Sequence, residues 1–157
     1  MIKKNKNLFA KLEQQIDDIL HKKVSILNRL QNICKLLKEH AMYYDWVGFY
    51  FVDGENPNQL ILGPFEGAPT EHTRIPFGQG VCGQVAEDGR ARIVQDIEQE
   101  ENYLSCSIDV KSEIVEPIFK KGKFIGEIDI DSHTIAAFSV EDEVFLKMIA
   151  EKVSGRL

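Results

Sequence analysis

Hydrophobic residues recur at steps of three and four over the first forty positions. Two stripes share this spacing: Leu8, Leu12, Ile16 and Ile19, followed by Leu27, Leu30, Cys34 and Leu37. The phase is lost at His21-Lys22-Lys23. Since a period near 3.6 residues is typical of helices with one buried face, the pattern predicts a two-part N-terminal helix over residues 8–40.

Farther along, aromatic and β-branched runs alternate with turn residues, a pattern typical of short strands. The runs predict strands at residues 46–52, 59–65, 73–76, 91–95, 113–120 and 123–129. Turn sequences join the first two strands at 53–58 and the last two at 121–123, so each pair is expected to form a hairpin.

The last segment again has helical spacing, from Val144 to Val153, and Ser139 resembles an N-cap followed by acidic residues. Helices at both ends of about six largely antiparallel strands predict an α+β fold, with the terminal helices packed on one face of the sheet. No repeat or linker divides the chain. We expect one domain over 1–157, with N-terminal helices at about 8–40 and a core at about 44–157.

The 157 residues include 25 acidic and 19 basic side chains, a net charge of −6. Because nucleic-acid affinity comes mainly from clustered cations, this balance argues against a nucleic-acid partner. No apolar run approaches the roughly 20 residues of a membrane span, and the Lys-rich start is not followed by a signal-peptide hydrophobic region. We therefore expect a cytoplasmic protein without a membrane partner.

Three cysteines, an odd number without a secretory signal, argue against a structural disulfide framework. Cys34 falls on the apolar stripe of the N-terminal helix, where a buried core thiol is the commoner role. Cys82 and Cys106 are left as catalytic, metal-binding or inert thiols.

The segment from Gly78 to Gly83 matches the G-x-G-x-x-G pattern of dinucleotide-binding proteins, and Asp96 follows at a suitable distance. A dinucleotide fold needs a longer crossover helix, whereas Glu87-Asp88-Gly89 ends any helix after about seven residues. We interpret the glycines as a tight turn before a short helix. A helix N-terminus favours a thiolate, so Cys82 is a candidate reactive cysteine.

Five blocks, in this order and with this spacing, resemble the free methionine-(R)-sulfoxide reductases: Trp46–Tyr50, Leu62–Gly67, Thr73–Gly83, Ser112–Val115 and Ile128–Ser132. The resemblance covers about residues 46–145. It implies a GAF domain, a homodimer, and an enzyme that reduces the free amino acid L-methionine-(R)-sulfoxide with thioredoxin as external reductant and no bound cofactor.

The resemblance also implies roles for cysteines. The family's usual nucleophile maps onto Cys106 and its middle cysteine onto Cys82, whereas its usual resolving cysteine falls on His72. Our hypothesis is that Cys82 attacks the sulfenic acid formed on Cys106, which requires Cα atoms within about 7 Å or a loop that moves. His72 would instead tune a thiolate, or join both cysteines around a metal; their spacing lacks a zinc signature, so we expect no metal.

Carboxylates provide the candidate receptor for an ammonium group. Asp129 and Asp131 alternate in one predicted strand and share a face, and Glu113 lies on the predicted partner strand. Crowding would keep one of them protonated, as an acid catalyst must be. The resemblance implies that Asp129 binds the ammonium while Glu113 and Asp131 hold the sulfoxide oxygen. The alternative is a solvated strand face.

Trp46 and Tyr50 share strand parity and are candidates for the pocket wall, with core packing as the alternative. Fold alone does not fix function. The main rival function is therefore a non-catalytic GAF domain that binds a small amino-acid-like ligand, and a structural or interaction domain is the third possibility.

Overall fold

A six-stranded antiparallel sheet forms the centre of the computed structural model, which describes residues 2–104 and 109–157. The strand order is β3-β2-β1-β6-β5-β4. The strands are β1 (Trp46–Val52), β2 (Gln59–Glu66), β3 (Arg74–Pro76), β4 (Arg92–Val94), β5 (Ser112–Lys120) and β6 (Lys123–Ser132). Both predicted hairpins, β1–β2 and β5–β6, are confirmed.

The β5–β6 hairpin is longer than its sequence pattern predicts. Ser112 pairs with Ser132, and its hydroxyl donates a hydrogen bond to the backbone oxygen of Thr134 at 2.6 Å. Asp131 therefore lies within strand β6, which continues to Ser132, and it is 1% exposed.

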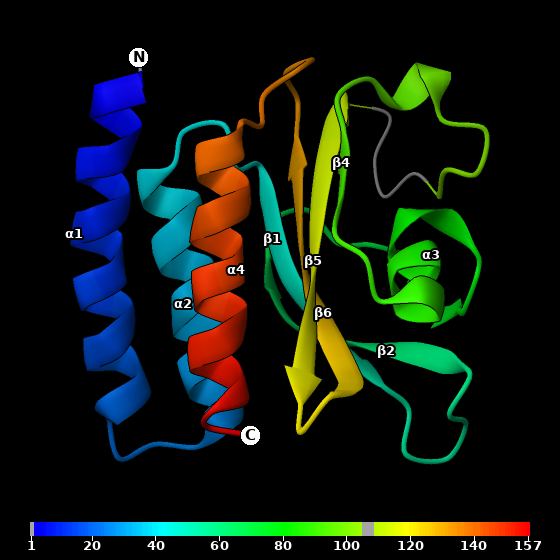
Figure 1. Ribbon diagram of the computed structural model, residues 1–157, viewed down its shortest axis with the longest axis horizontal. Coiled ribbons are helices and arrows are strands. Elements are labelled where there is room, and N and C mark those ends of the chain that lie inside the picture. Colours follow the sequence, from blue (N-terminus) through cyan, green and yellow to red (C-terminus); the bar gives the residue numbers. More distant parts are fainter. Residues whose placement is uncertain (1, 105–108) are drawn as a thin grey trace.

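Three long helices cover one face of the sheet: α1 (Ile2–His21), α2 (Ile26–His40) and α4 (Val140–Ser154). They lie side by side in Figure 1, whereas the short α3 (Gly80–Asp88) lies on the opposite side of the sheet. The predicted break between α1 and α2 is confirmed, and the Ser25 hydroxyl caps α2 by accepting from the Asn28 amide at 3.2 Å.

Alternation along β6 separates two cores. Ile128 and Ile130 belong to the larger core beneath the long helices, while Asp129 and Asp131 belong to the other parity and the opposite face. The smaller core on that face includes Trp46, Tyr50, Cys82 and residues from α3. The sheet thus isolates the buried acidic residues of β6 from the helical layer.

Helix α3 is short because glycines bound it at both ends. Gly78 and Gly80 have φ values of 87° and 65°, and Gly89 ends the helix with φ 70° in the left-handed region. A Cβ on Gly83 would approach the backbone oxygen of Pro76 to 2.7 Å, so only glycine allows this close contact with β3. The helix has nine residues, slightly more than expected, and the antiparallel sheet around it lacks the parallel βαβ units of a dinucleotide fold.

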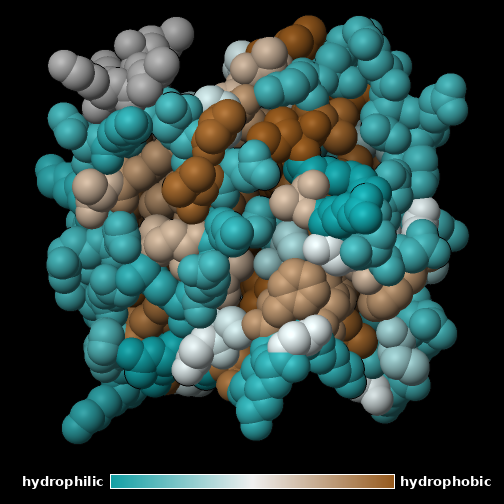
Figure 2. All heavy atoms as spheres, viewed as in Figure 1, coloured by the Kyte–Doolittle hydropathy of each residue, from teal (hydrophilic) through white to brown (hydrophobic). Residues whose placement is uncertain are grey.

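The outer face of the helical layer includes an apolar groove between α1 and α4. Figure 2 shows hydrophobic side chains at the surface over the N-terminal half of α4. Phe9, Val144 and Met148 contribute to the lining, and Val144 is 64% exposed. Among the residues described, no helix has the length and apolar character needed to cross a bilayer.

Candidate active site

Four carboxyl side chains are buried on the α3 face of the β5–β6 hairpin. Glu113 is 5% exposed, Glu127 is fully buried, and Asp129 and Asp131 are each 1% exposed. Glu113 pairs in register with Asp131. This burial excludes the solvated strand face, and it brings the three predicted acidic residues together on one face.

Cys82 lies against this acidic group. Its Sγ–H donates to Glu113 Oε1 at 3.8 Å, and the thiol and the carboxyls of Glu113 and Asp129 place one ligand atom each within 4.8 Å of one another. A void of about 10 Å³ is lined by these three residues together with Tyr50 and His72. This volume suits a single small species, such as a water molecule or an ion.

Burial changes the protonation of the acidic residues. It raises the pKa of Asp129 to about 6, and burial followed by the charge of Asp129 raises the pKa of Asp131 well above its ordinary value. Burial likewise holds the pKa of Glu127 well above that of a free glutamate. At neutral pH Asp129 is therefore mainly ionised, while protonated carboxyls lie beside it. This arrangement suits both cation binding and proton donation.

The structure contradicts the expected thiolate at Cys82. Although the residue lies in the first turn of α3, burial raises the pKa of its thiol well above the ordinary value, and the charges of Asp129, Glu127 and Glu113 raise it further. Desolvation and these three acidic side chains outweigh the effect of the helix N-terminus. Cys82 is consequently a protonated thiol in this state of the protein.

Two aromatic residues of β1 hold the segment that carries His72. The indole N–H of Trp46 donates to the backbone oxygen of Ala68 at 3.1 Å, and the Tyr50 hydroxyl donates to the backbone oxygen of His72 at 3.0 Å. The two rings stack with centroids 6.3 Å apart. Both face the α3 side, where Tyr50 lines the small void, so the predicted wall is also part of the core.

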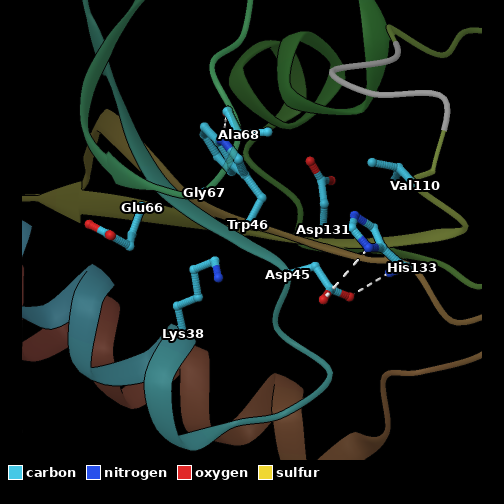
Figure 3. Close-up of a pocket in the computed structure, with 9 residues that line it drawn as sticks. All are labelled: Lys38, Asp45, Trp46, Glu66, Gly67, Ala68, Val110, Asp131 and His133. Carbon is cyan, nitrogen blue, oxygen red and sulfur yellow. Dashed lines mark hydrogen bonds and ion pairs between the residues drawn. The ribbon is translucent and has the colours of Figure 1, made fainter.

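A larger pocket lies at the end of β6. It has a volume of about 400 Å³, within the usual range for small-ligand sites, and Figure 3 shows Trp46, Asp131 and Val110 on one side with Lys38 of α2 opposite. Neither carboxyl oxygen of Asp131 has a hydrogen-bond partner among the described residues. This buried carboxyl is thus available to a ligand in a pocket of amino-acid size.

The predictions for the cysteines differ in how far the structure tests them. Cys34 is fully buried in the helical core, where its thiol donates to the backbone oxygen of Pro64 at 3.5 Å, as the sequence predicts. Cys106 lies outside the described residues, and so does any contact with it. Among the described residues, Glu113 and Asp129 form a potential ligand group with Cys82. The alternative grouping of His72 with both cysteines, which the sequence did not favour, includes Cys106 and so lies partly outside the described residues.

Two contributors were missed from the sequence. Glu127 shares the parity of Asp129 and could have been found by extending the same alternation one step back. Asn102 caps α3 from a distant loop: its Oδ1 accepts from the Gly80 amide at 2.9 Å and its Nδ2 donates to the Gly78 oxygen at 2.8 Å. No local sequence signal identifies this second contact.

Comparison with known proteins agrees with this architecture. Residues 25–157 match the GAF domain family. The chain is 40% identical over 141 residues to GAF domain-containing protein A of Dictyostelium discoideum, covering 90% of this chain and 87% of that protein. It is 32% identical over 145 residues to the free methionine-R-sulfoxide reductase of Escherichia coli, covering 92% of this chain and 86% of that protein.

A solved structure shows the same fold. The free methionine-R-sulfoxide reductase from Neisseria meningitidis, in complex with its substrate, superposes with a TM-score of 0.88 and 36% sequence identity. The similarity covers 94% of this chain and 87% of that one.

Proposed function

The chain belongs to the GAF-domain family of free methionine-(R)-sulfoxide reductases, which are oxidoreductases, and we propose that it reduces free L-methionine-(R)-sulfoxide to methionine. The main support for this proposal is that Glu113, Asp129 and Asp131 are buried together on one sheet face, beside the thiol of Cys82. A non-catalytic ligand-binding domain needs no protonated acid next to a cysteine.

Substrate recognition follows from charge. The ammonium group of the free amino acid pairs with ionised Asp129, and the sulfoxide oxygen accepts hydrogen bonds from Glu113 and Asp131, which pair in register. Burial raises the pKa of Asp131 and keeps its proton available at neutral pH. Trp46 lines the same pocket as Asp131 and gives the thioether an apolar contact.

In the proposed chemistry the Cys106 thiolate attacks the sulfoxide sulfur. The sulfur–oxygen bond breaks, the oxygen is protonated and transferred to Cys106 as a sulfenic acid, and methionine leaves with two more electrons than the substrate had. Asp131 supplies the proton. Cys82 then attacks the sulfenic acid, forming a Cys82–Cys106 disulfide and releasing water, after its own proton has been lost.

Thioredoxin, a dithiol reductant, returns the disulfide to two thiols, so that no bound cofactor is needed. A reducing compartment such as the cytoplasm supports this cycle. The proposal includes a homodimer, which sedimentation analysis of the intact chain would detect as twice the chain mass.

Turnover of free L-methionine-(R)-sulfoxide tests the proposal directly. We expect activity with thioredoxin or with a small dithiol. Cys106→Ser should lose roughly a thousandfold or more, since it removes the nucleophile. Cys82→Ser should retain a single turnover but lose steady-state activity with thioredoxin. Cys34→Ser is the matched control, because this buried thiol lies in the helical core.

Three results would contradict parts of the proposal. Binding without turnover, in both the wild type and His72→Cys, would favour the non-catalytic GAF domain. Activity that survives Cys106→Ser would remove Cys106 as nucleophile. Mass spectrometry that finds persistent sulfenic acid and no Cys82–Cys106 linkage after one equivalent of substrate would exclude the proposed recycling step.

A further inference from the structure

The acidic group around Cys82 contains more oxygen ligands than its protein neighbours satisfy. Asp129 Oδ1 and both carboxyl oxygens of Glu127 have no hydrogen-bond partner among the described residues, although both side chains are at least 99% buried. Buried polar atoms are normally paired, so unpaired oxygens in a closed site indicate a missing partner. A partner that satisfies several oxygens at once must be a donor-rich or cationic species.

The geometry around the void fits a single metal ion. Zinc at bond lengths of roughly 2.0–2.3 Å places neighbouring ligands roughly 3.3–3.7 Å apart in a tetrahedron. Cys82 Sγ and Glu113 Oε1 are 3.8 Å apart, and Asp129 completes a set within 4.8 Å. Small side-chain adjustments would therefore close the three atoms around one ion. The adjoining void of about 10 Å³ has room for that ion.

We propose that Cys82, Glu113 and Asp129 form a reversible binding site for a divalent ion of borderline softness, with zinc as the best-matched ion. A thiolate and two carboxylates are ligands that zinc accepts, whereas magnesium and calcium avoid sulfur. On binding, the Cys82 thiol proton leaves to solvent and no electrons are transferred. Three anionic ligands around a dication have a net charge of −1, so the ion compensates most of the negative charge of the buried ligands.

Zinc at this site would act as an inhibitor. It would occupy Asp129 and Glu113, which the proposed reaction assigns to the ammonium group and the sulfoxide oxygen. It would also hold Cys82 as a metal thiolate, unavailable for attack on a sulfenic acid. Binding itself is measured without turnover, so it stands or falls separately from the proposed reaction.

Calorimetric titration of the reduced, chelator-treated chain with Zn²⁺ tests the site. We expect one ion per chain, and Co²⁺ should produce the near-ultraviolet absorption of a thiolate–cobalt bond. Cys82→Ser and Asp129→Asn should each weaken binding by about a hundredfold or more, because each removes a direct ligand. Cys34→Ser, a buried thiol elsewhere, and Glu116→Gln, a buried carboxyl on the other sheet face, are matched controls and should bind as the wild type does.

A second measurement needs no variant. At denaturant concentrations just below the unfolding transition, Zn²⁺ should protect Cys82 from alkylation. Mass spectrometry locates the labelled cysteines, and the labelling of Cys34 serves as the internal reference. Absence of stoichiometric Zn²⁺ binding would overturn the proposal. Unchanged Zn²⁺ affinity in Cys82→Ser would also overturn it. So would a loss of affinity in Cys106→Ser as large as that in Cys82→Ser, because Cys106 would then be a thiol ligand of the ion.

Discussion

Glu116 is a buried carboxyl on the helical face of β5, away from the candidate active site. It is 6% exposed, and its Oε2 has no hydrogen-bond partner among the described residues. Burial first, and then the charges of Glu143 and Glu151 against the opposing effect of Lys147, raise the pKa of Glu116 to about 7. The native protein therefore binds a proton here that the unfolded chain releases at lower pH.

This difference makes stability depend on pH. Below about pH 4.5 both states are protonated, and between about 4.5 and 7 the native state alone keeps the proton, so the wild type loses stability as pH rises. Glu116→Gln should raise the free energy of unfolding by about 1–2 kcal/mol at pH 8 and have almost no effect at pH 4. This value is discounted because the groove is open to solvent on one side.

Urea denaturation at the two pH values measures this effect. Glu39→Gln, at an exposed position of α2 that does not influence Glu116, serves as the control and should change stability by less than about 0.5 kcal/mol at either pH. An equal gain for Glu116→Gln at both pH values would show that packing, rather than ionisation, is responsible.

Residue-level prediction from sequence succeeded where a spacing rule applied and failed where a contact came from far along the chain. Parity placed Asp129 and Asp131 on one face, and the apolar stripe placed Cys34 in the core. The charge state of Cys82 could not be predicted locally, because its thiol is surrounded by acidic side chains of β5 and β6. The same limit applies to Asn102, which reaches α3 across 22 residues of sequence.

At the scale of elements, the first turn of α4 is fixed by one buried carboxylate. Asp142 is fully buried and accepts hydrogen bonds from the Tyr43 and Tyr44 hydroxyls at 2.6 and 2.7 Å. It also accepts from the backbone amide of Ser139 at 2.9 Å and from its hydroxyl at 3.0 Å. The carboxylate therefore joins the start of α4 to the segment between α2 and β1.

Asp142→Ala should lower the free energy of unfolding by about 3–5 kcal/mol, because it removes the cap and leaves two tyrosine hydroxyls without their acceptor. Denaturant unfolding measures the loss. Val144→Ala, at a 64% exposed position of the same helix, should cost less than about 0.5 kcal/mol. Comparable losses for both variants would mean that α4 is sensitive to any substitution and that the carboxylate has no special role.

The order and type of the elements were predictable because each has a clear period and clear turn residues. The boundaries were less so: β6 continues to Ser132 because it pairs with β5, a contact that a single-strand pattern does not contain. Ser139 was correctly identified before α4, yet the tyrosines that bind Asp142 in the same turn, Tyr43 and Tyr44, lie almost a hundred residues earlier. Long-range pairing, rather than local propensity, decides these details.

At the scale of the whole molecule, the two cores differ in composition. The core beneath α1, α2 and α4 is large and apolar, whereas the smaller core beneath α3 adjoins several buried carboxyls. Regions with fewer apolar contacts open at lower free energy. The α3 side should therefore be the first part of the molecule to open.

Hydrogen exchange under native conditions tests this expectation. Amides of α3 should show a lower opening free energy than those of α2, and a ligand held by Asp129 should slow exchange in α3 while leaving α2 unchanged. Uniform protection across both sides of the sheet would contradict the expected order of opening.

The hydrogen bonds from Trp46 and Tyr50 to the backbone of residues 68 and 72 have a consequence for descent within the family. They bind backbone oxygens, so these two contacts do not depend on which side chain stands at position 72. A lineage can therefore exchange histidine and cysteine there while the backbone keeps its course, trading one chemical group for another beside the same void. A substitution at this position would then change the chemistry beside the void while both hydrogen bonds to the backbone stay in place.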